Sequence, residues 1–291
     1  MAGLEQLALQ RMVIPGDIEI HYAQAGEGPP LVFVHGGMGD WTSWAPQWEA
    51  FTARFRCFTY SRRYSSPNRN QINSTGHSVL AEAQDLASLL EGWEAEPAVL
   101  VGTSYGAYTA LQVALAWPQK VRALALTEPP VLPFADRVAG GREARVRFER
   151  EVLRPSDAAF SAGQAEEAVR MLTLGINGSG AGEASTPAGR ERRLRNAEAM
   201  RALALSSNAY PALDEAAMQA LRVPTLLLHG DRTLDVHRAT TAAVAQLMPQ
   251  AQTMQIADSG HGVHRDNPAQ FNRSVMAFLA RELNLHASEL S

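Results

Sequence analysis

Residues 97–106 read P-A-V-L-V-G-T-S-Y-G, and this stretch decides the fold. The first half is a short apolar run, typical of a buried strand, and residues 105–117 have the pattern of a helix. Between them, residues 102–106 match G-x-S-x-G on a tight strand-to-helix turn. Such a turn holds its serine in a strained backbone conformation that exposes the hydroxyl group. We therefore expect Ser104 to be a nucleophile rather than an ordinary turn residue.

Short apolar runs alternate with helical stretches on both sides of this turn. Apolar and polar residues alternate over residues 18–23, which favours an edge strand. Further strands are expected within residues 29–37, 55–60, 121–130, 223–231 and 251–261, and helices at 78–93, 105–117 and 267–285. This alternation predicts an α/β fold with a mostly parallel sheet covered on both faces.

One long segment interrupts the alternation. From about residue 131 to residue 221 we find helical stretches, a Gly/Ser-rich spacer and no convincing strand. We expect a core made of residues 1–130 and 222–291. The segment 131–221 would be a helical insertion after the sixth strand.

A glycine-rich loop follows the strand at 30–34, and it reads His35-Gly36-Gly37-Met38-Gly39. Acyl transfer needs two N–H donors for the developing oxyanion. The backbone N–H of Tyr105, directly after the nucleophile, is one candidate. Gly37 is our choice for the other, with Met38 second, and His35 is expected to be a structural turn residue.

A serine hydroxyl also needs a proton acceptor within reach. His261 has the best setting of the eight histidines, because D-S-G-H-G follows the last strand and precedes the final helix. His264 is the nearest competitor but lies on the helical side. His229 is expected to be structural.

The order H-G-G, G-T-S-Y-G, S-G-H resembles that of the α/β-hydrolase superfamily, over roughly residues 18–285. The elements S-R-R-Y-S-S-P-N and T-E-P-P are similar to those of an esterase-like branch. The resemblance implies the α/β-hydrolase fold, with segment 131–221 in the place of the family's lid, and a triad of nucleophile, histidine and acid. It does not indicate a substrate.

The acid departs from the commonest pattern of this superfamily. The usual aspartate position, after the strand that begins V-P-T-L-L-L, holds Thr233, flanked by Asp231 and Asp235. A second arrangement in the superfamily places the acid after the preceding strand, where this chain has Glu128. We choose Glu128, with Asp231 as the alternative and Asp235 third.

Substrate contacts are less well determined by sequence. Met38, Trp41 and Arg62 are candidates, although the helical spacing of Trp41, Trp44 and Trp48 favours core packing and paired arginines are usually solvated. Arg62 would suit a substrate carboxylate. Apolar residues of the insertion are candidates for an acyl pocket or for packing against the core: Phe134, Phe148, Phe160, Met171, Leu172 and Leu174.

Composition excludes several classes of partner. A net charge of -4, from 26 basic and 30 acidic side chains, favours neither a nucleic-acid nor a membrane partner. Cys57, the single cysteine, is expected to be a buried strand residue. We find no signal peptide, membrane-length apolar run, metal cluster, phosphate loop or dinucleotide fingerprint. A cytoplasmic monomer or homodimer without cofactor, acting on a small apolar ester-like molecule, is therefore expected.

These patterns together predict a serine hydrolase acting on a carboxylic ester, lactone or thioester. A C–C bond hydrolase, an amidase or a cofactor-free perhydrolase would keep the same triad and stays open. So does a ligand-binding receptor on this fold. A haloalkane dehalogenase or epoxide hydrolase is disfavoured, because both need a carboxylate at the position of Ser104.

Overall fold

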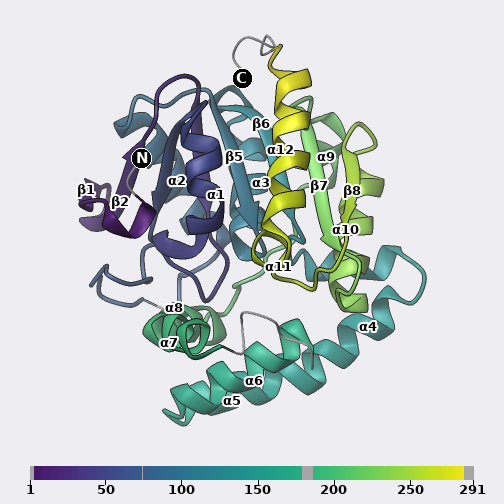
Figure 1. Cartoon of the computed structure of the whole chain (residues 1–291). Helices are drawn as coiled ribbons and strands as arrows, with labels where there is room; N and C mark the ends of the chain where they lie inside the picture. The colour runs from purple at the N-terminus through teal and green to yellow at the C-terminus, as the bar shows by residue number, and fades with distance from the viewer. Residues whose placement is uncertain (1–2, 74, 179–185, 285–291) are drawn as a thin grey trace.

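An eight-stranded sheet runs through the centre of the molecule (Figure 1). The structure is a computed structural model that describes residues 3–73, 75–178 and 186–284. The strands are β1 (Gln10–Ile14), β2 (Ile18–Ala25), β3 (Pro30–Val34), β4 (Arg56–Tyr60), β5 (Ala98–Thr103), β6 (Val121–Thr127), β7 (Thr225–Gly230) and β8 (Gln252–Ile256). Their order is β1-β2-β4-β3-β5-β6-β7-β8, antiparallel from β1 to β4 and parallel from β4 onwards. The expected mostly parallel sheet is confirmed.

The prediction that residues 18–23 form an edge strand is wrong. β2 pairs with β1 on one side and with β4 on the other, so β1 is the edge. β1 is mostly exposed, with only Ile14 buried, which is why its five residues give little periodic signal.

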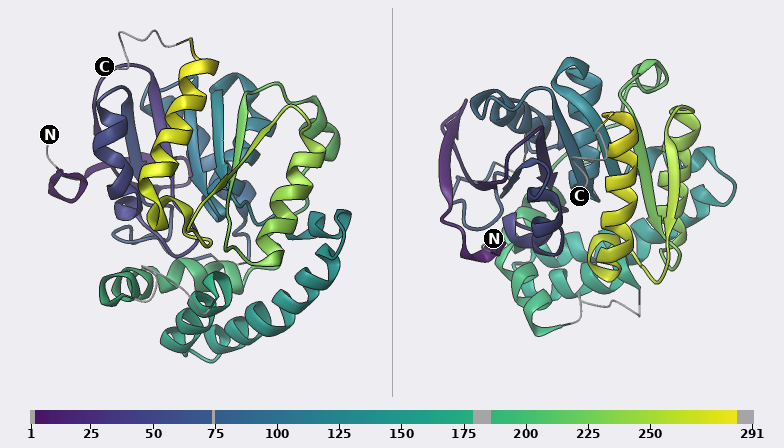
Figure 2. Two further views of the ribbon diagram at one scale, coloured as in Figure 1. Left: turned by 45° about the vertical axis from the view of Figure 1, so that its right-hand side comes forward. Right: turned by 45° about the horizontal axis from the view of Figure 1, so that its top comes forward.

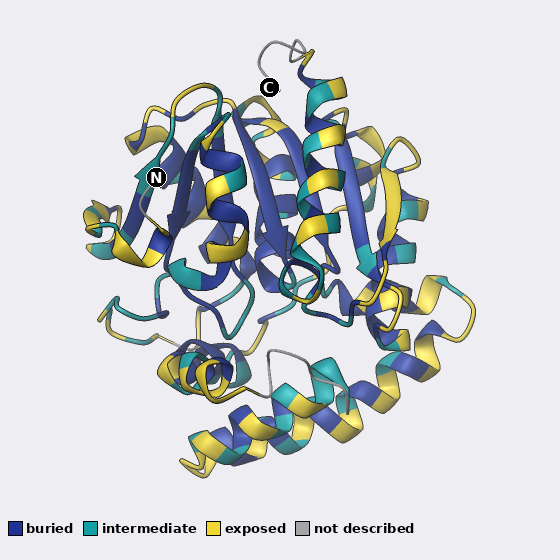
Figure 3. Cartoon of the chain, viewed as in Figure 1, coloured by how far each residue is buried: buried dark blue, intermediate teal, exposed yellow. Residues whose placement is uncertain are grey.

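Helices cover both faces of the sheet. Side chains alternate between the faces, so Val99 and Val101 pack on one side and Leu100 on the other. One layer contains α1 (Ala45–Thr52) and α12 (Pro268–Glu282). The other contains α2 (Val79–Gly92), α3 (Tyr105–Ala116) and α10 (Asp235–Leu247). Figure 3 shows the sheet as the buried centre between these layers.

The described residues between β6 and β7 form helices joined by turns and loops, and none of them forms a strand. These helices are η4 (Leu132–Arg137), α4 (Gly141–Phe148), a π-helical turn at Glu149–Leu153, α5 (Arg154–Ser161), α6 (Ala165–Asn177), α7 (Pro187–Arg195), α8 (Ala197–Ala204) and α9 (Glu215–Ala220). Most of the Gly/Ser-rich spacer, residues 179–185, lies outside the described residues. Figures 1 and 2 show that α5 to α8 lie across the carboxyl ends of the parallel strands.

A buried carboxylate fastens this helical segment to the core. Asp40, after β3, accepts hydrogen bonds from Arg195 Nη2 at 2.8 Å and Asn196 Nδ2 at 2.9 Å. Asn196 in turn accepts a hydrogen bond from the backbone N–H of Ser66 at 2.8 Å. The contacts join residues that are more than 100 positions apart, so they fix the helices over the sheet edge where the predicted nucleophile lies.

None of the described helices is both long enough and apolar enough to cross a lipid bilayer.

Candidate active site

Ser104 occupies a strained turn between β5 and α3. Its backbone has φ 51° and ψ -124°, which is rare for a residue with a side chain. The turn closes tightly, because a Cβ atom on Gly106 would lie 2.2 Å from the carbonyl oxygen of Val34. A Cβ atom on Gly102 would lie 2.7 Å from the Cα atom of Ala107. Both glycines of the G-x-S-x-G motif are therefore required by close packing.

Glu128 lies at the equivalent point of the neighbouring strand and is also strained, with φ 46°. Its carboxylate is fully buried. The backbone N–H of Gly230 donates to Oε1 at 2.9 Å, and the Thr233 hydroxyl donates to Oε2 at 2.8 Å. The ring nitrogen Nδ1 of His261 lies 2.6 Å from Oε2. Burial acts to raise the pKa of Glu128, but the hydrogen bond and charge of His261 outweigh it and lower the pKa.

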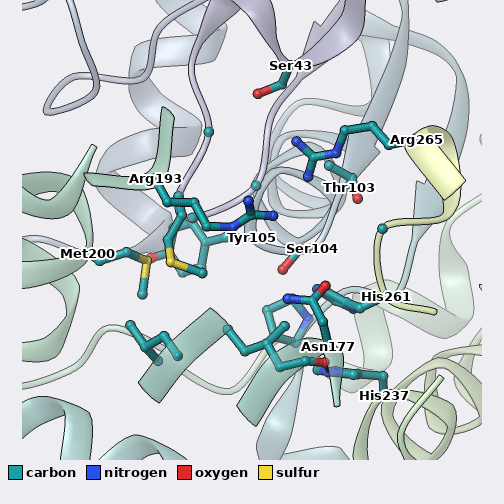
Figure 4. Close-up of a pocket in the computed structure, with 18 of the residues that line it drawn as sticks. Ser43, Thr103, Ser104, Tyr105, Asn177, Arg193, Met200, His237, His261 and Arg265 are labelled. Carbon is teal, nitrogen blue, oxygen red and sulfur yellow. Dashed lines mark hydrogen bonds between the residues drawn. The ribbon is translucent and has the colours of Figure 1, made fainter. Parts of the chain in front are cut away.

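The carboxylate fixes the orientation of His261. An ionised carboxylate only accepts hydrogen bonds, so Nδ1 of the neutral ring carries the hydrogen and Nε2 is left as the proton acceptor. His261 and Ser104 line the same cavity, and Figure 4 shows the Ser104 hydroxyl beside the His261 ring. The structure thus brings together Ser104, His261 and Glu128, the three residues chosen from sequence.

The two alternative acids lie elsewhere. Asp231 is exposed and accepts a hydrogen bond from the backbone N–H of Ser259 at 2.9 Å, which holds the loop ahead of His261. Asp235 is 65% exposed at the start of α10, where it pairs with Arg147 and Arg238. Neither carboxylate forms a hydrogen bond or an ion pair with His261, whereas Glu128 does, so the geometry favours Glu128.

The glycine-rich loop after β3 faces the same cavity. The Gly36 carbonyl oxygen lies 2.8 Å from Nδ1 of His35, a fully buried side chain. In a trans peptide the N–H points opposite to the carbonyl, so the N–H of Gly37 faces away from this buried ring. Gly37 and Tyr105 both line the cavity beside Ser104. As the first residue of α3, Tyr105 has no helical partner for its N–H. The positions of both suit the predicted oxyanion donors.

The prediction that Arg62 contacts the substrate is wrong. The residue is 1% exposed and does not line the cavity. Its guanidinium pairs with Glu82 at 3.1 Å, donates to the Gly37 carbonyl oxygen at 3.0 Å, and lies 5.0 Å from the centre of the Tyr105 ring. The charge is neutralised beneath the loop, so Arg62 braces the two candidate oxyanion donors instead of binding ligand.

The prediction that Trp41 contacts the substrate is also wrong. This tryptophan lies outside the cavity and packs against the α1–α12 layer, while its backbone bonds Ser61 and Thr59. Trp44 and Trp48 pack on Phe33 in the core, as their helical spacing indicated. Met38, the remaining candidate contact, does line the cavity.

The helical segment supplies much of the cavity wall. Of the six apolar residues named from sequence, Phe148 and Leu172 line the cavity. Phe134 and Phe160 are buried elsewhere, Met171 packs on the core, and Leu174 is 45% exposed. Sequence reasoning did not find the following lining residues: Leu132, Leu153, Ile176, Asn177, Arg193, Met200, Tyr210, His237 and Arg265. Only their convergence in space identifies them.

His237, on α10, stacks on the candidate base. The ring centroids of His237 and His261 are 4.1 Å apart and the rings are inclined by 24°. The ring nitrogen Nε2 of His237 lies 3.1 Å from the carbonyl oxygen of Ile176 in α6. Burial and the nearby His261 lower the pKa of His237 to about 3, so this ring is neutral at pH 7. His237 thereby links the helical segment to the face of His261.

Among the described residues, one group has the composition of a metal site. One donor atom each of Glu128, His237 and His261 lies within 4.8 Å of the others. The hydrogen bond between Glu128 and His261, however, already engages the buried carboxylate and Nδ1. The donors therefore fit a hydrogen-bonded acid–base pair better than a cation.

Three further histidines among the described residues, His35, His229 and His264, have structural surroundings. Nε2 of His35 accepts a hydrogen bond from the backbone N–H of Arg62 at 3.0 Å, and burial followed by the charge of Arg62 lowers the pKa of His35 to about 3. His229 lies 3.3 Å from the Gly230 carbonyl oxygen. His264 is buried on the short helix α11 (Val263–Asp266), and its ring centroid lies 4.5 Å from that of Trp44. Cys57 is buried in β4, as expected, and burial raises its pKa.

A model of the α/β-hydrolase fold matches residues 29–268. The chain belongs to the α/β-hydrolase family. It is 26% identical to the sn-1-specific diacylglycerol lipase ABHD11 of Mus musculus over 290 residues, covering 96% of this chain and 87% of that protein.

Solved structures give the same fold at low identity. The enol-lactonase from Burkholderia xenovorans LB400 has a TM-score of 0.74 at 17% identity, covering 93% of this chain and 100% of that one. A thermophilic esterase from Thermogutta terrifontis has a TM-score of 0.73 at 21% identity, covering 95% and 99%. These α/β-hydrolases share the fold of this member of the family.

Proposed function

We propose that this α/β-hydrolase is a serine hydrolase that cleaves a carboxylic ester, lactone or thioester through an acyl-enzyme on Ser104. The single observation that carries the proposal is the 2.6 Å contact between Glu128 and Nδ1 of His261, on the cavity that Ser104 also lines. It orients the free Nε2 as a base, and it provides a buried negative charge to stabilise the imidazolium that forms.

The proposed reaction has two halves. Nε2 of His261 removes the hydroxyl proton of Ser104 as Oγ bonds to the substrate carbonyl carbon, and the carbonyl π electrons move to oxygen. The N–H groups of Tyr105 and Gly37 stabilise that oxyanion. The C–O or C–S bond then breaks, and His261 gives its proton to the leaving alcohol or thiol. Water repeats the sequence on the acyl-enzyme and releases the carboxylic acid.

The helices α5 to α8 are proposed to act as a lid over this site. They lie across the sheet edge, and Met200 of α8 packs so closely on Gly37 that a Cβ atom there would lie 2.6 Å from its sulfur. A cavity of about 90 Å³ beneath them is small for a ligand site, so we expect short acyl groups to be preferred.

Active-site labelling tests the nucleophile. A fluorophosphonate probe should add one adduct to the wild-type protein, located on Ser104, and none to Ser104→Ala. Ser43→Ala is the matched control, because Ser43 also lines the cavity and should leave labelling unchanged. Turnover of short p-nitrophenyl esters should fall by at least about 10³-fold in Ser104→Ala.

Two outcomes would contradict the proposal. If neither adduct nor ester turnover appears, Ser104 is not an activated nucleophile. If a ligand forms a long-lived complex and is not turned over within seconds, the chain is a receptor on this fold. A C–C bond hydrolase or perhydrolase would be labelled too, so ester turnover is the discriminating measurement.

A further inference from the structure

Two histidine rings, His237 and His261, form a stacked pair in the wall of the cavity. Their centroids are 4.1 Å apart and the rings are inclined by 24°. His237 is 3% exposed and His261 is 8% exposed, so the pair is almost wholly buried. Figure 4 shows both side chains entering the cavity from the same side. The candidate base is thus held against a residue that has no place in the triad of Ser104, His261 and Glu128.

The hydrogen bond to Glu128 holds one edge of the His261 ring and leaves the tilt of the ring open. Nδ1 lies 2.6 Å from Oε2 of Glu128. The χ2 torsion of a histidine is broad, so the ring can tilt about this contact and carry Nε2 away from Ser104. Proton transfer needs the two atoms within about 2.6–3.2 Å of each other. His237 lies against the face of the ring, so the stack limits the tilt that the hydrogen bond permits.

Helix α6 of the proposed lid fixes the position of His237. Nε2 of His237 lies 3.1 Å from the carbonyl oxygen of Ile176, the last residue but one of α6. A carbonyl oxygen only accepts, so Nε2 carries the hydrogen and donates it. The last carbonyl groups of a helix have no partner within that helix, and this one accepts from His237 instead. Phe148 of α4 packs its ring against the same side chain, with the centroids 5.7 Å apart. The candidate base is therefore connected to α6 through one ring and one hydrogen bond.

The second ring nitrogen of His237 shows what a histidine adds at this position. Nδ1 has no hydrogen-bond partner among the residues that the structure describes. A buried acceptor without a donor costs about 1–3 kcal/mol, so packing alone would favour an apolar ring. The donor on Nε2 is the feature that an apolar ring lacks. The contact with Ile176 is therefore what distinguishes His237 from a phenylalanine.

The charge of His237 suits a partner of the base. Burial, followed by the charge of His261, lowers the pKa of His237 to about 3, so the ring is neutral at pH 7. A protonated ring in this stack would oppose the imidazolium that forms on His261, because like charges repel. The neutral ring can hold the base in place without hindering its protonation.

We propose that His237 is a positioning residue: its ring, anchored on the carbonyl group of Ile176, keeps Nε2 of His261 aligned with the hydroxyl group of Ser104. This inference rests on the proposed serine hydrolase function, in which His261 is the base. His237 takes no part in proton transfer. Alignment of the base then depends on the seating of α6 over the sheet edge, so the proposed lid and the triad act together.

Two substitutions separate the ring from its hydrogen bond. His237→Phe keeps a stacked ring without the donor to Ile176, and His237→Leu removes both. His237→Leu should lower kcat for p-nitrophenyl acetate by at least about 30-fold, since a shift of about 1 Å in a reacting group can cost about 10²-fold. His237→Phe should lose less, about tenfold. KM should change less than about threefold in both variants, because His237 positions the base and does not bind the substrate.

Thr241→Val is the matched control for packing. Thr241 lies on the same helix, α10, is 2% exposed, and its hydroxyl group has no hydrogen-bond partner among the described residues. Replacing an unpaired hydroxyl group by a methyl group should leave kcat within about twofold of wild type. A loss as large as that of His237→Leu would mean that any change in α10 disturbs the site, and it would overturn the assignment to His237.

Proton NMR observes the base without any reaction. In Ser104→Ala, the hydrogen on Nδ1 of His261 that bonds Glu128 should give a downfield resonance, and adding Glu128→Ala should remove it. His237→Leu should broaden this resonance, because a tilting ring opens the hydrogen bond to exchange with water. His237→Phe should broaden it less, and Thr241→Val should leave it sharp. Unchanged resonances in the rest of the protein show that each variant is folded.

The two measurements separate failure of this inference from failure of the proposed function. An unchanged kcat and a sharp resonance in His237→Leu overturn the positioning role, even when the fluorophosphonate probe still labels Ser104. A loss confined to KM overturns it too, and makes His237 a substrate contact. If the wild type is neither labelled nor active, the proposed function fails, whereas broadening in His237→Leu still supports the positioning of His261.

Discussion

The hydroxyl group of Thr233 donates a hydrogen bond of 2.8 Å to Oε2 of Glu128. Thr233 stands where the commonest pattern of the family has the acid, and Glu128 reaches the same histidine from the neighbouring strand. Thr233 is 5% exposed, so its side chain fills the buried position that an aspartate has in the commonest pattern. Its hydroxyl group provides a hydrogen-bond donor for the carboxylate of Glu128. We therefore expect the two positions to form one acid site that can be occupied from either strand.

This relationship predicts that the acid can be relocated. Glu128→Ala should lower kcat by about 10³-fold, because His261 loses its orientation and its counter-charge. Adding Thr233→Asp should recover at least tenfold of that loss. Thr233→Asn in the same background is the matched control and should recover nothing, since it adds no charge. Steady-state ester hydrolysis measures all three, and equal activity of the Asp and Asn variants would contradict a shared acid site.

A second prediction separates the candidate acids in the wild-type background. Glu128→Gln should reduce kcat by about 10³-fold, because an amide can donate to Nδ1 and hold the wrong tautomer. Asp231→Asn should stay within threefold of wild type, since its oxygen can still accept the hydrogen bond from Ser259. A large loss in Asp231→Asn with a small loss in Glu128→Gln would move the acid to Asp231.

A third prediction concerns Arg62 beneath the glycine-rich loop that follows β3. Arg62→Met removes the hydrogen bond to the Gly37 carbonyl oxygen and leaves Glu82 buried without its arginine partner. The double variant Arg62→Met with Glu82→Gln also removes the uncompensated charge, so its activity reports the effect of losing the hydrogen bond to the loop at Gly37. We expect kcat to fall about tenfold with little change in KM, because oxyanion contacts strengthen in the transition state. A change confined to KM would instead indicate a substrate contact.

The residues of the candidate site that could be predicted from the sequence are those that lie in a turn directly after a strand. Ser104, Tyr105, Gly37 and His261 each follow a strand within a few residues, so a motif and its spacing place them at one sheet edge. Glu128 needed the additional knowledge that the family allows two acid positions. Its strained φ of 46° and its contact with Thr233 are three-dimensional features that no local pattern reports.

The errors have a common physical origin. Arg62 looked like an anion-binding residue because its partner, Glu82, is 20 positions away on helix α2. Arg193, Arg265 and His237 were missed because they reach the cavity from three separate helices. Which charges are neutralised and which residues line the cavity depend on how the helices between β6 and β7 pack on the sheet. The spacing of residues along the chain does not predict that packing.

A fourth prediction uses the packing of the nucleophile turn. Gly106→Ala should destabilise the protein by about 3 kcal/mol or more, because the new Cβ atom would meet the Val34 carbonyl oxygen at 2.2 Å. Gly76→Ala is the matched control, since nothing lies within 4 Å of a Cβ atom there. Urea unfolding of both variants measures the free energy of unfolding. Equal values would mean that the turn accommodates the new Cβ atom without loss of stability.

The last prediction links buried histidines to acid stability. Burial, followed by the charge of a neighbouring residue, lowers the pKa of both His35 and His237 to about 3, against about 6.5 in an unfolded chain. Between these values the unfolded chain binds more protons than the folded one, so stability falls as pH falls from about 6.5 toward 3.

His237→Phe keeps an aromatic ring against His261 and removes one of these titrating groups. Each group contributes about 1.4 kcal/mol per pH unit, so the wild type should lose about 2 kcal/mol more than this variant between pH 6.5 and pH 5. Urea unfolding at the two values measures the difference, and the curves should run parallel above pH 7. Identical losses below pH 6.5 would mean that His237 becomes protonated within the folded protein, and the neutral ring assigned to it beside the candidate base would have to be abandoned.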